Sequence, residues 1–138
     1  GMASLKEIDK VYKVFKKKRI DLALLHCVSS YPNKDDSSYL SNIPFLKNRF
    51  KCEIGISDHT NDIKIPIYGN LIGAKIMEKH LKINDNHKCV DASVSITGKQ
   101  LLQLKLETDN IKKILKVVSF GVRKEEIGSK IFKRNKIL

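Results

Sequence analysis

Two segments of the sequence place histidine and carboxylate side chains at the ends of apolar, β-branched runs. The first is EIGISDHT, over residues 53–60, which contains His59. The second is GAKIMEKHL, over residues 73–81, which contains Glu78 and His80. Two imidazoles with oxygen ligands suit Mn, Fe, Co or Zn better than Ca or Mg. These side chains are therefore candidates for a divalent-metal site.

The elements that must position these residues alternate between helix and strand. A capping box at residues 4–7 and apolar residues at helical spacing predict a first helix. Nearly continuous apolar runs predict three strands that are buried on both faces. The expected helices cover residues 5–18, 40–50, 62–72 and 97–119, and the expected strands cover residues 21–28, 52–57 and 73–81. Alternating βα units of this kind predict an α/β fold with a parallel sheet.

In parallel α/β sheets, ligands bind at the carboxyl ends of the strands. Glu78 and His80 are two residues apart, so both lie on one face of their strand, and Lys79 lies on the other. His59 ends the neighbouring strand, about 4.8 Å away. We therefore expect His59 and His80 to share one ion, with Glu78 beside them. The alternatives are hydrogen-bonded histidines and a salt bridge from Glu78 to a lysine.

Two further side chains follow the first strand. His26 lies within an apolar run, on the face opposite Cys27, and a hydrogen-bonded structural role is expected for it. Tyr31 precedes a proline in a polar loop. Its ring is interpreted either as an anchor for that loop or as a surface that stacks on a sugar-like substrate.

Composition narrows the functional classes. The chain has 138 residues, 41% of them hydrophobic, which is enough for one domain. No apolar run reaches the roughly 18–20 residues of a membrane span, and the N-terminal residues lack the apolar core of a signal peptide. The net charge of +12 is scattered, without a zinc-finger or RNP-like motif, so nucleic-acid binding is not expected. Three cysteines without a CxxC motif indicate reduced thiols and a cytoplasmic location.

The segments LALLHCVSSYP, IGISDHT and GAKIMEKHLKI occur in the order and at about the spacing of one enzyme family. The opening GMASLKEI is also similar to the segment that follows the family's fifth barrel strand. On these motifs the chain resembles the sialic acid synthases, over residues 1–118.

The resemblance implies a (β/α)8 barrel of the TIM type, of which this chain carries the last three strands. Residues 119–138 would then be a tail or linker before an antifreeze-like domain that the sequence lacks. The family condenses phosphoenolpyruvate with an N-acyl mannosamine-type sugar and releases phosphate. It uses a divalent metal, commonly Mn²⁺, which would act as a Lewis acid on the sugar's aldehyde.

The resemblance also implies roles for individual side chains. His59 and His80 match the two metal-binding histidines, and Glu78 matches a catalytic carboxylate beside the sugar and the metal. Tyr31 matches a sugar-binding tyrosine, and Ser29 matches a polar residue near phosphoenolpyruvate. For the family's loop aspartate, Asp91 fits best, because ASVSIT then leads into the last helix as in the family, and Asp85 is the rival. The loop lacks the family's usual proline and glycine.

The same comparison implies an incomplete site. The family's glutamate on its first strand and its phosphoenolpyruvate-binding lysine and serines have no counterpart in this sequence. We therefore expect this chain to be inactive alone. Its open strand edges would be covered by self-association, by a polypeptide that supplies the rest of the barrel, or by rearranged helices. The alternative functions are a non-enzymatic basic interaction module and another metal- or phosphoenolpyruvate-dependent barrel enzyme.

Overall fold

A computed structural model of the chain describes residues 1–133. Its α-helices are α1 (Leu5–Lys18), α2 (Asn42–Phe50), α3 (Lys64–Leu71) and α4 (Gly98–Ile114). Its strands are β1 (Ala23–Cys27), β2 (Glu53–Asp58), β3 (Ile76–Lys79), β4 (Leu81–Lys82) and β5 (Ile96–Thr97). Short 3₁₀ helices are η1 (Asp35–Ser37), η2 (Ala92–Val94) and η3 (Lys124–Phe132).

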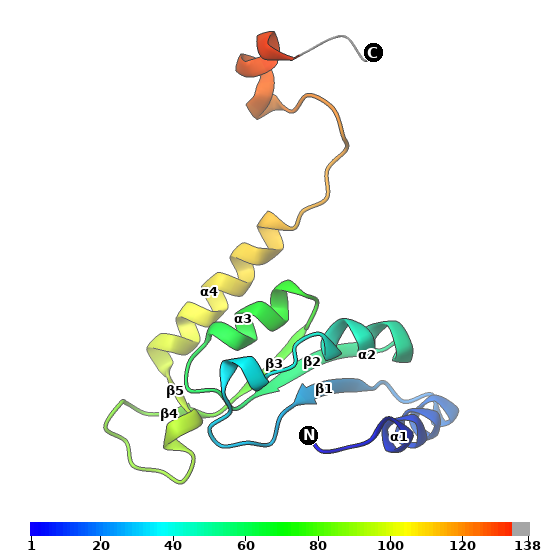
Figure 1. The fold of residues 1–138 in the computed structure, drawn as a ribbon, viewed down its shortest axis with the longest axis vertical. Helices are drawn as coiled ribbons and strands as arrows, with labels where there is room; N and C mark the ends of the chain where they lie inside the picture. The colour runs from blue at the N-terminus through cyan, green and yellow to red at the C-terminus, as the bar shows by residue number, and fades with distance from the viewer. Residues whose placement is uncertain (134–138) are drawn as a thin grey trace.

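The central sheet has the strand order β1-β2-β3, and both pairs of neighbours are parallel (Figure 1). Helix α2 joins the first pair of strands and α3 joins the second. The predicted α/β fold with parallel βα units is therefore confirmed.

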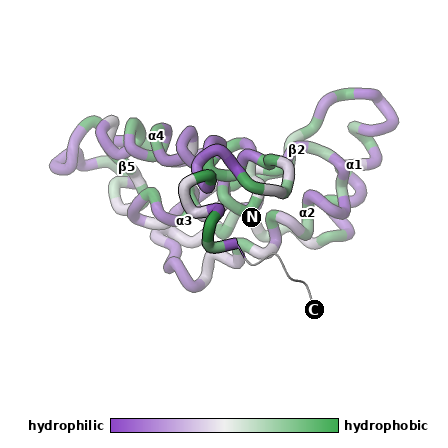
Figure 2. The backbone as a smooth tube through the Cα atoms, turned by 90° about the horizontal axis from the view of Figure 1, so that it is seen from above, coloured by the Kyte–Doolittle hydropathy of each residue, from purple (hydrophilic) through white to green (hydrophobic). Residues whose placement is uncertain are grey.

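Helices α2 and α3 cover the same face of this sheet. Right-handed crossovers that advance across a sheet in one direction place their helices on one side, which explains this arrangement. Between sheet and helices lies the main core, where Ile43 and Phe50 of α2 meet Ile54 and Ile56 of β2. In Figure 2 hydrophobic segments gather in the middle of the molecule, while α1 and α4 on its two sides are largely hydrophilic.

The prediction that all strands are buried on both faces is wrong for residues 1–133. On the second face of the sheet, Leu25 and Cys27 are only partly buried, and Ile76 is 40% exposed. Helices α2 and α3 do not cover that face, since their crossovers place them on the other. The same face carries the candidate site at its carboxyl edge.

The third predicted strand, over residues 73–81, is divided in two. β3 ends at Lys79, His80 lies outside any strand, and β4 follows. β4 pairs in parallel with β5 in a separate two-stranded sheet, and the Ile96 N–H donates to the His80 carbonyl over 2.9 Å. The change of pairing partner at His80 is a long-range effect, which a local apolar pattern does not encode.

The capping box predicted at residues 4–7 forms. Ser4 caps α1, where its hydroxyl and N–H donate to the Glu7 carboxylate over 2.6 and 2.7 Å and lower the pKa of Glu7. Thr97 and Gln100 cap α4 in the same way. Helix α4 ends at Ile114, before the expected residue 119. The last residues expected in this helix include Val117, which is 94% exposed and therefore has no packing to offset the low helix propensity of a β-branched residue.

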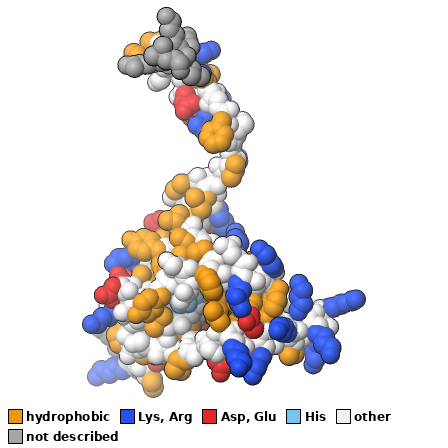
Figure 3. Space-filling model, turned by 45° about the vertical axis from the view of Figure 1, so that its right-hand side comes forward, with side chains coloured by type: hydrophobic (Ala, Val, Ile, Leu, Met, Phe, Trp, Pro, Cys, Tyr) orange, Lys and Arg blue, Asp and Glu red, His pale blue; other side chains and the backbone are white. Residues whose placement is uncertain are grey.

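Beyond α4 the chain leads away from the sheet to η3 (Figure 1). The large hydrophobic side chains of this part, including Phe120 and Phe132, are exposed. The proposed tail over residues 119–138 stays a prediction, and its residues 134–138 lie outside the described part. No helix within residues 1–133 is long and apolar enough to cross a membrane. In Figure 3 the lysine and arginine side chains are spread over the visible surface, with hydrophobic groups between them.

Candidate functional site

The carboxyl ends of β2 and β3 present different side chains on the two faces of the sheet. Ser57 is the register partner of Glu78, and its hydroxyl donates to Glu78 Oε1 over 2.7 Å on the open face. Asp58 is the register partner of Lys79, and these two side chains form an ion pair on the face that α2 and α3 cover. Strand alternation thus separates a polar open edge from a buried charged pair.

Three rings meet at the open edge. The ring centroids of His59 and His80 are 5.3 Å apart. The Tyr31 ring is tilted over His59 at 4.1 Å and meets His80 edge-on at 5.8 Å. The loop after β1 therefore brings Tyr31 against both histidines, which come from the ends of β2 and β3.

His59 is buried, with 5% of its surface exposed, and its ring orientation is fixed by one oxygen. Its Nδ1 lies 3.0 Å from the Val28 carbonyl oxygen, which can only accept. The proton of a neutral His59 is therefore assigned to Nδ1, and Nε2 keeps its lone pair. This is the tautomer of a metal-binding histidine whose other nitrogen is held by a second group.

His80 is held in a similar way by a carboxylate. Its Nδ1 lies 3.4 Å from Asp91 Oδ2, and the two side chains are 34% and 41% exposed. Asp85, the rival loop position, is 86% exposed and lies 3.9 Å from Lys82 Nζ. The structure thus brings Asp91 into the cluster and leaves Asp85 outside it.

Ser29 lies at the rim of this cluster and is exposed. Cys27 Sγ lies 3.7 Å from Ser29 Oγ and 3.8 Å from His59 Nδ1, so the cysteine sits between them. All six predicted site residues therefore lie at the carboxyl edge of the strands or in the loops that follow them. They are Ser29, Tyr31, His59, Glu78, His80 and Asp91.

The donor set fits a divalent transition metal with two protein nitrogens. Nε2 of His59 is left with a lone pair, and the Asp91 contact leaves Nε2 of His80 available in the same way. Within residues 1–133 no group of three or more His, Cys, Asp or Glu side chains is placed to hold an ion. The remaining ligands would have to be water, substrate oxygens or other polypeptide.

His26 has the structural role predicted for it. It is 9% exposed, on the helix-covered face, and its Nε2 lies 2.7 Å from the Ser38 carbonyl oxygen. This contact holds the loop between β1 and α2.

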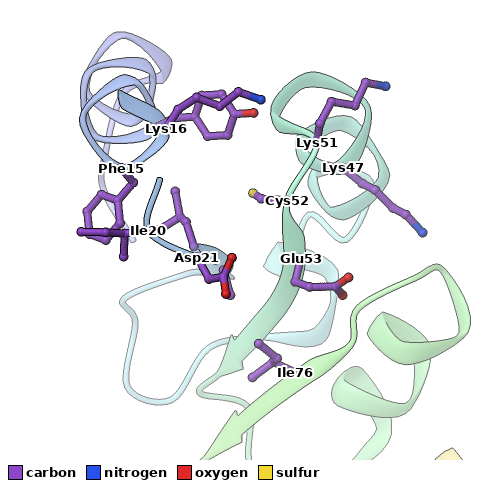
Figure 4. A pocket seen from close by; sticks show the side chains of 12 residues that line it. Phe15, Lys16, Ile20, Asp21, Lys47, Lys51, Cys52, Glu53 and Ile76 are labelled. Carbon is purple, nitrogen blue, oxygen red and sulfur yellow. The ribbon is translucent and has the colours of Figure 1, made fainter. Parts of the chain in front are cut away.

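A separate open pocket lies at the opposite, amino ends of the strands (Figure 4). Phe15 and Ile20 line it together with Cys52, Glu53 and Ile76, and none of the six predicted site residues does. Burial, and secondarily the charge of Glu53, raise the pKa of the Cys52 thiol. The pocket therefore contributes no side chain to the candidate site.

The Asp58–Lys79 ion pair was not predicted from the sequence. Lys79 was expected on the face opposite Glu78 and His80, without a partner. The available signal was the alternation itself, since Asp58 and Lys79 occupy equivalent, helix-facing positions at the ends of two neighbouring strands.

The chain is similar to proteins of one known family. The NeuB family model matches residues 1–119. The chain is 34% identical over 127 residues to the N,N'-diacetyllegionaminic acid synthase of Campylobacter jejuni, and it is 31% identical over 114 residues to the N-acetylneuraminate-9-phosphate synthase of Drosophila melanogaster. A crystal structure of N-acetylneuraminic acid synthetase from Leptospira borgpetersenii in complex with citrate superposes with a TM-score of 0.86, at 37% identity.

These matches cover most of this chain but only part of each relative. They include 90% of this chain and 37% of the Campylobacter enzyme, and 81% and 31% for the Drosophila enzyme. The Leptospira superposition covers 96% of this chain and 46% of the solved one. The family resemblance read from the motifs is thus confirmed, and the chain belongs to the NeuB family.

Proposed function

We propose that this chain carries the sugar- and metal-binding half of a synthase site that condenses phosphoenolpyruvate with an N-acyl mannosamine-type sugar. The observation that carries this proposal is the meeting of the His59 and His80 rings at 5.3 Å, with the Tyr31 ring in contact with both. The relatives named as legionaminic acid and N-acetylneuraminate-9-phosphate synthases support the reaction class.

In this proposal His59 Nε2 and His80 Nε2 hold a divalent ion, which we expect to be Mn²⁺. Bound there, the ion would supply a Lewis acid that polarises the aldehyde of the sugar. The Val28 carbonyl and the Asp91 carboxylate orient the two imidazoles toward it. Holding both rings in place before substrate arrives lowers the cost of organising the site during the reaction.

Other side chains act on the sugar. Glu78, held by Ser57 on the open face, would accept hydrogen bonds from sugar hydroxyls and exchange a proton at the reacting oxygen. Tyr31 is 51% exposed, so part of its ring is free to cover one face of the sugar. Asp91 would also act on the sugar, and the exposed Ser29 would contact phosphoenolpyruvate.

For the finer architecture we propose the last three βα units of a (β/α)8 barrel. Two observations support this: β1 and β3 are the edges of the described three-stranded sheet, and the face opposite its helices is open. That face would line the barrel interior once further strands close it. The groups that bind phosphoenolpyruvate would come from polypeptide outside this chain, and residues 119–138 would link to a further domain.

The free cysteines bear on the cellular compartment that we propose for this chain. Cys27, Cys52 and Cys89 are free in the structure, and all three are at least partly exposed. Free thiols persist in a reducing compartment, which supports the cytoplasm as the proposed place of this enzyme.

A complementation assay tests the proposed function. The chain is mixed with a polypeptide that supplies the first five βα units of a relative, and phosphate release from phosphoenolpyruvate is measured with N-acetylmannosamine and Mn²⁺. Turnover should require both polypeptides and should be lost with His59→Ala. No phosphate release from a mixture shown to form a complex would contradict the proposal.

A further inference from the structure

A buried ion pair lies beneath the candidate site, on the face covered by the helices. Lys79 Nζ is 2.6 Å from Asp58 Oδ2, and both side chains are 3% exposed. Buried ion pairs are often no more stabilising than apolar residues of similar volume. The preceding register pair on this face, Ile56 and Met77, is apolar, so an apolar pair would suit this layer. Stability alone therefore does not account for the charges.

The hydrogen bonds around the ion pair involve the residues on either side of His59 in the sequence. Asp58 Oδ2 accepts from the Thr60 hydroxyl over 2.7 Å, and Asp58 Oδ1 accepts from the Thr60 N–H over 3.3 Å. Lys79 Nζ also donates to the Thr60 carbonyl oxygen. Thr60 is fully buried. The residues directly before and after His59 are thus tied to one ammonium group on the neighbouring strand.

His59 is also held by hydrogen bonds of its own main chain and ring. Its carbonyl oxygen accepts from the Asn33 N–H over 2.8 Å, and its ring is held at Nδ1 by the Val28 carbonyl. Lys79 lies between Glu78 and His80 in the chain, so the same ammonium fixes the end of β3. A displacement of either strand end would break charge-assisted bonds in a buried setting, where they are strong.

We propose that Lys79 and Asp58 are positioning residues, which set the distance and orientation of His59 relative to His80 from the opposite face of the sheet. This inference rests on the proposed function of the two histidines as metal ligands. The pair touches neither substrate nor metal, and its effect is transmitted through the main chain at residues 58–60.

The test replaces the pair without leaving a buried charge. In Asp58→Asn/Lys79→Met the amide oxygen can still accept from Thr60, while every bond between the two strands made by Lys79 Nζ is lost. Folding is checked by circular dichroism and by the urea midpoint. Two readouts follow: the imidazole ¹⁵N chemical shifts of His59 and His80 at pH 8 without metal, and the Mn²⁺ dissociation constant.

We expect the folded double variant to lose the single Nδ1–H tautomer of His59 and to bind Mn²⁺ about tenfold more weakly, as for loss of other outer-shell supports. The control is Arg49→Met, which removes the exposed 2.7 Å pair with Asp9 and should change neither readout. A folded double variant with wild-type imidazole signals would overturn the inference. If wild-type protein binds no Mn²⁺, the metal proposal fails, while the imidazole signals still decide the positioning role.

If the double variant does not fold, a milder variant tests the positioning role of Asp58 and Lys79. Thr60→Val keeps the volume of the side chain and the Asp58–Lys79 pair, and it removes only the 2.7 Å bond to Asp58. We expect a smaller shift of the His59 signals in the same direction. Unchanged signals in folded Thr60→Val would then count against the inference.

Discussion

The imidazole rings of His59 and His80 lie 5.3 Å apart, although 20 residues separate them in the chain and only His59 is buried. Parallel pairing of β2 and β3 produces this relationship, because both strands end at the same edge of the sheet. One carbonyl and one carboxylate then orient the two rings. The predictions below test this arrangement and the fold that supports it.

Alanine substitutions of two phenylalanines in α2 test the packing of the core between this helix and the sheet. Phe50 is 1% exposed and Phe45 is 47% exposed. Phe50→Ala should lower the free energy of unfolding by about 3–5 kcal/mol, because it removes a buried ring and leaves a cavity. Phe45→Ala is the matched control and should cost less than about 1 kcal/mol. Urea denaturation measures both, and equal losses would contradict the observed packing.

The contact between Tyr31 and His59 predicts a spectroscopic difference. The ring current of Tyr31, 4.1 Å away, should shift the ring protons of His59, and Tyr31→Ala should remove that shift. Tyr31→Phe keeps the ring and should preserve it. The alanine variant should also lose about 0.5–1.5 kcal/mol of stability, the range for aromatic contacts. Identical His59 spectra in the two variants would show that the rings do not meet in solution.

The cysteines should differ in reactivity with iodoacetamide. Cys89 is exposed, whereas burial raises the pKa of Cys52. A raised pKa leaves less thiolate at pH 7.5, so Cys52 should be alkylated more slowly than Cys89. The difference should shrink as the pH rises, because a growing fraction of Cys52 is then ionised. Mass spectrometry of the peptides measures the rates, and equal rates at pH 7.5 would contradict the prediction.

The open sheet edges predict association in solution. Within residues 1–133 the outer edges of β1 and β3 have no strand partner, and the hydrophobic side chain of Ile76 in β3 is 40% exposed. Such edges favour pairing with another chain. Light scattering at micromolar concentrations should give a mass above the 15.7 kDa of one chain. A stable monomer over that range would show that the chain protects its edges by itself.

Much of the site could be predicted because strand alternation and strand ends are local features. The period of two placed Glu78 and His80 on one face and Lys79 on the other, and the parallel sheet placed His59 beside them. Those relations depend only on apolar runs and on their connection by helices. The helices were predicted for the same reason, since their apolar residues recur at helical spacing and the first helix carries a capping box.

The remainder depends on contacts between distant segments. The break of the third strand at His80 follows from the pairing of β4 with β5, and the Asp91 contact follows from a loop without a regular pattern. Alternation puts Asp58 and Lys79 on the helix-covered face, and the register of β2 and β3 then makes them direct partners. The prediction that the strands are buried on both faces was wrong because an apolar strand sequence does not show whether the same chain or another polypeptide covers each face.

The central claim, that His59 and His80 together hold a divalent ion, is tested most directly by calorimetric titration with Mn²⁺. His59→Ala and His80→Ala should each weaken binding by more than tenfold, or about 1.4 kcal/mol. His87→Ala is the control, since this histidine lies in the loop between β4 and η2, and it should bind as wild type does. Equal Mn²⁺ affinity in wild type and in both site variants would contradict the account.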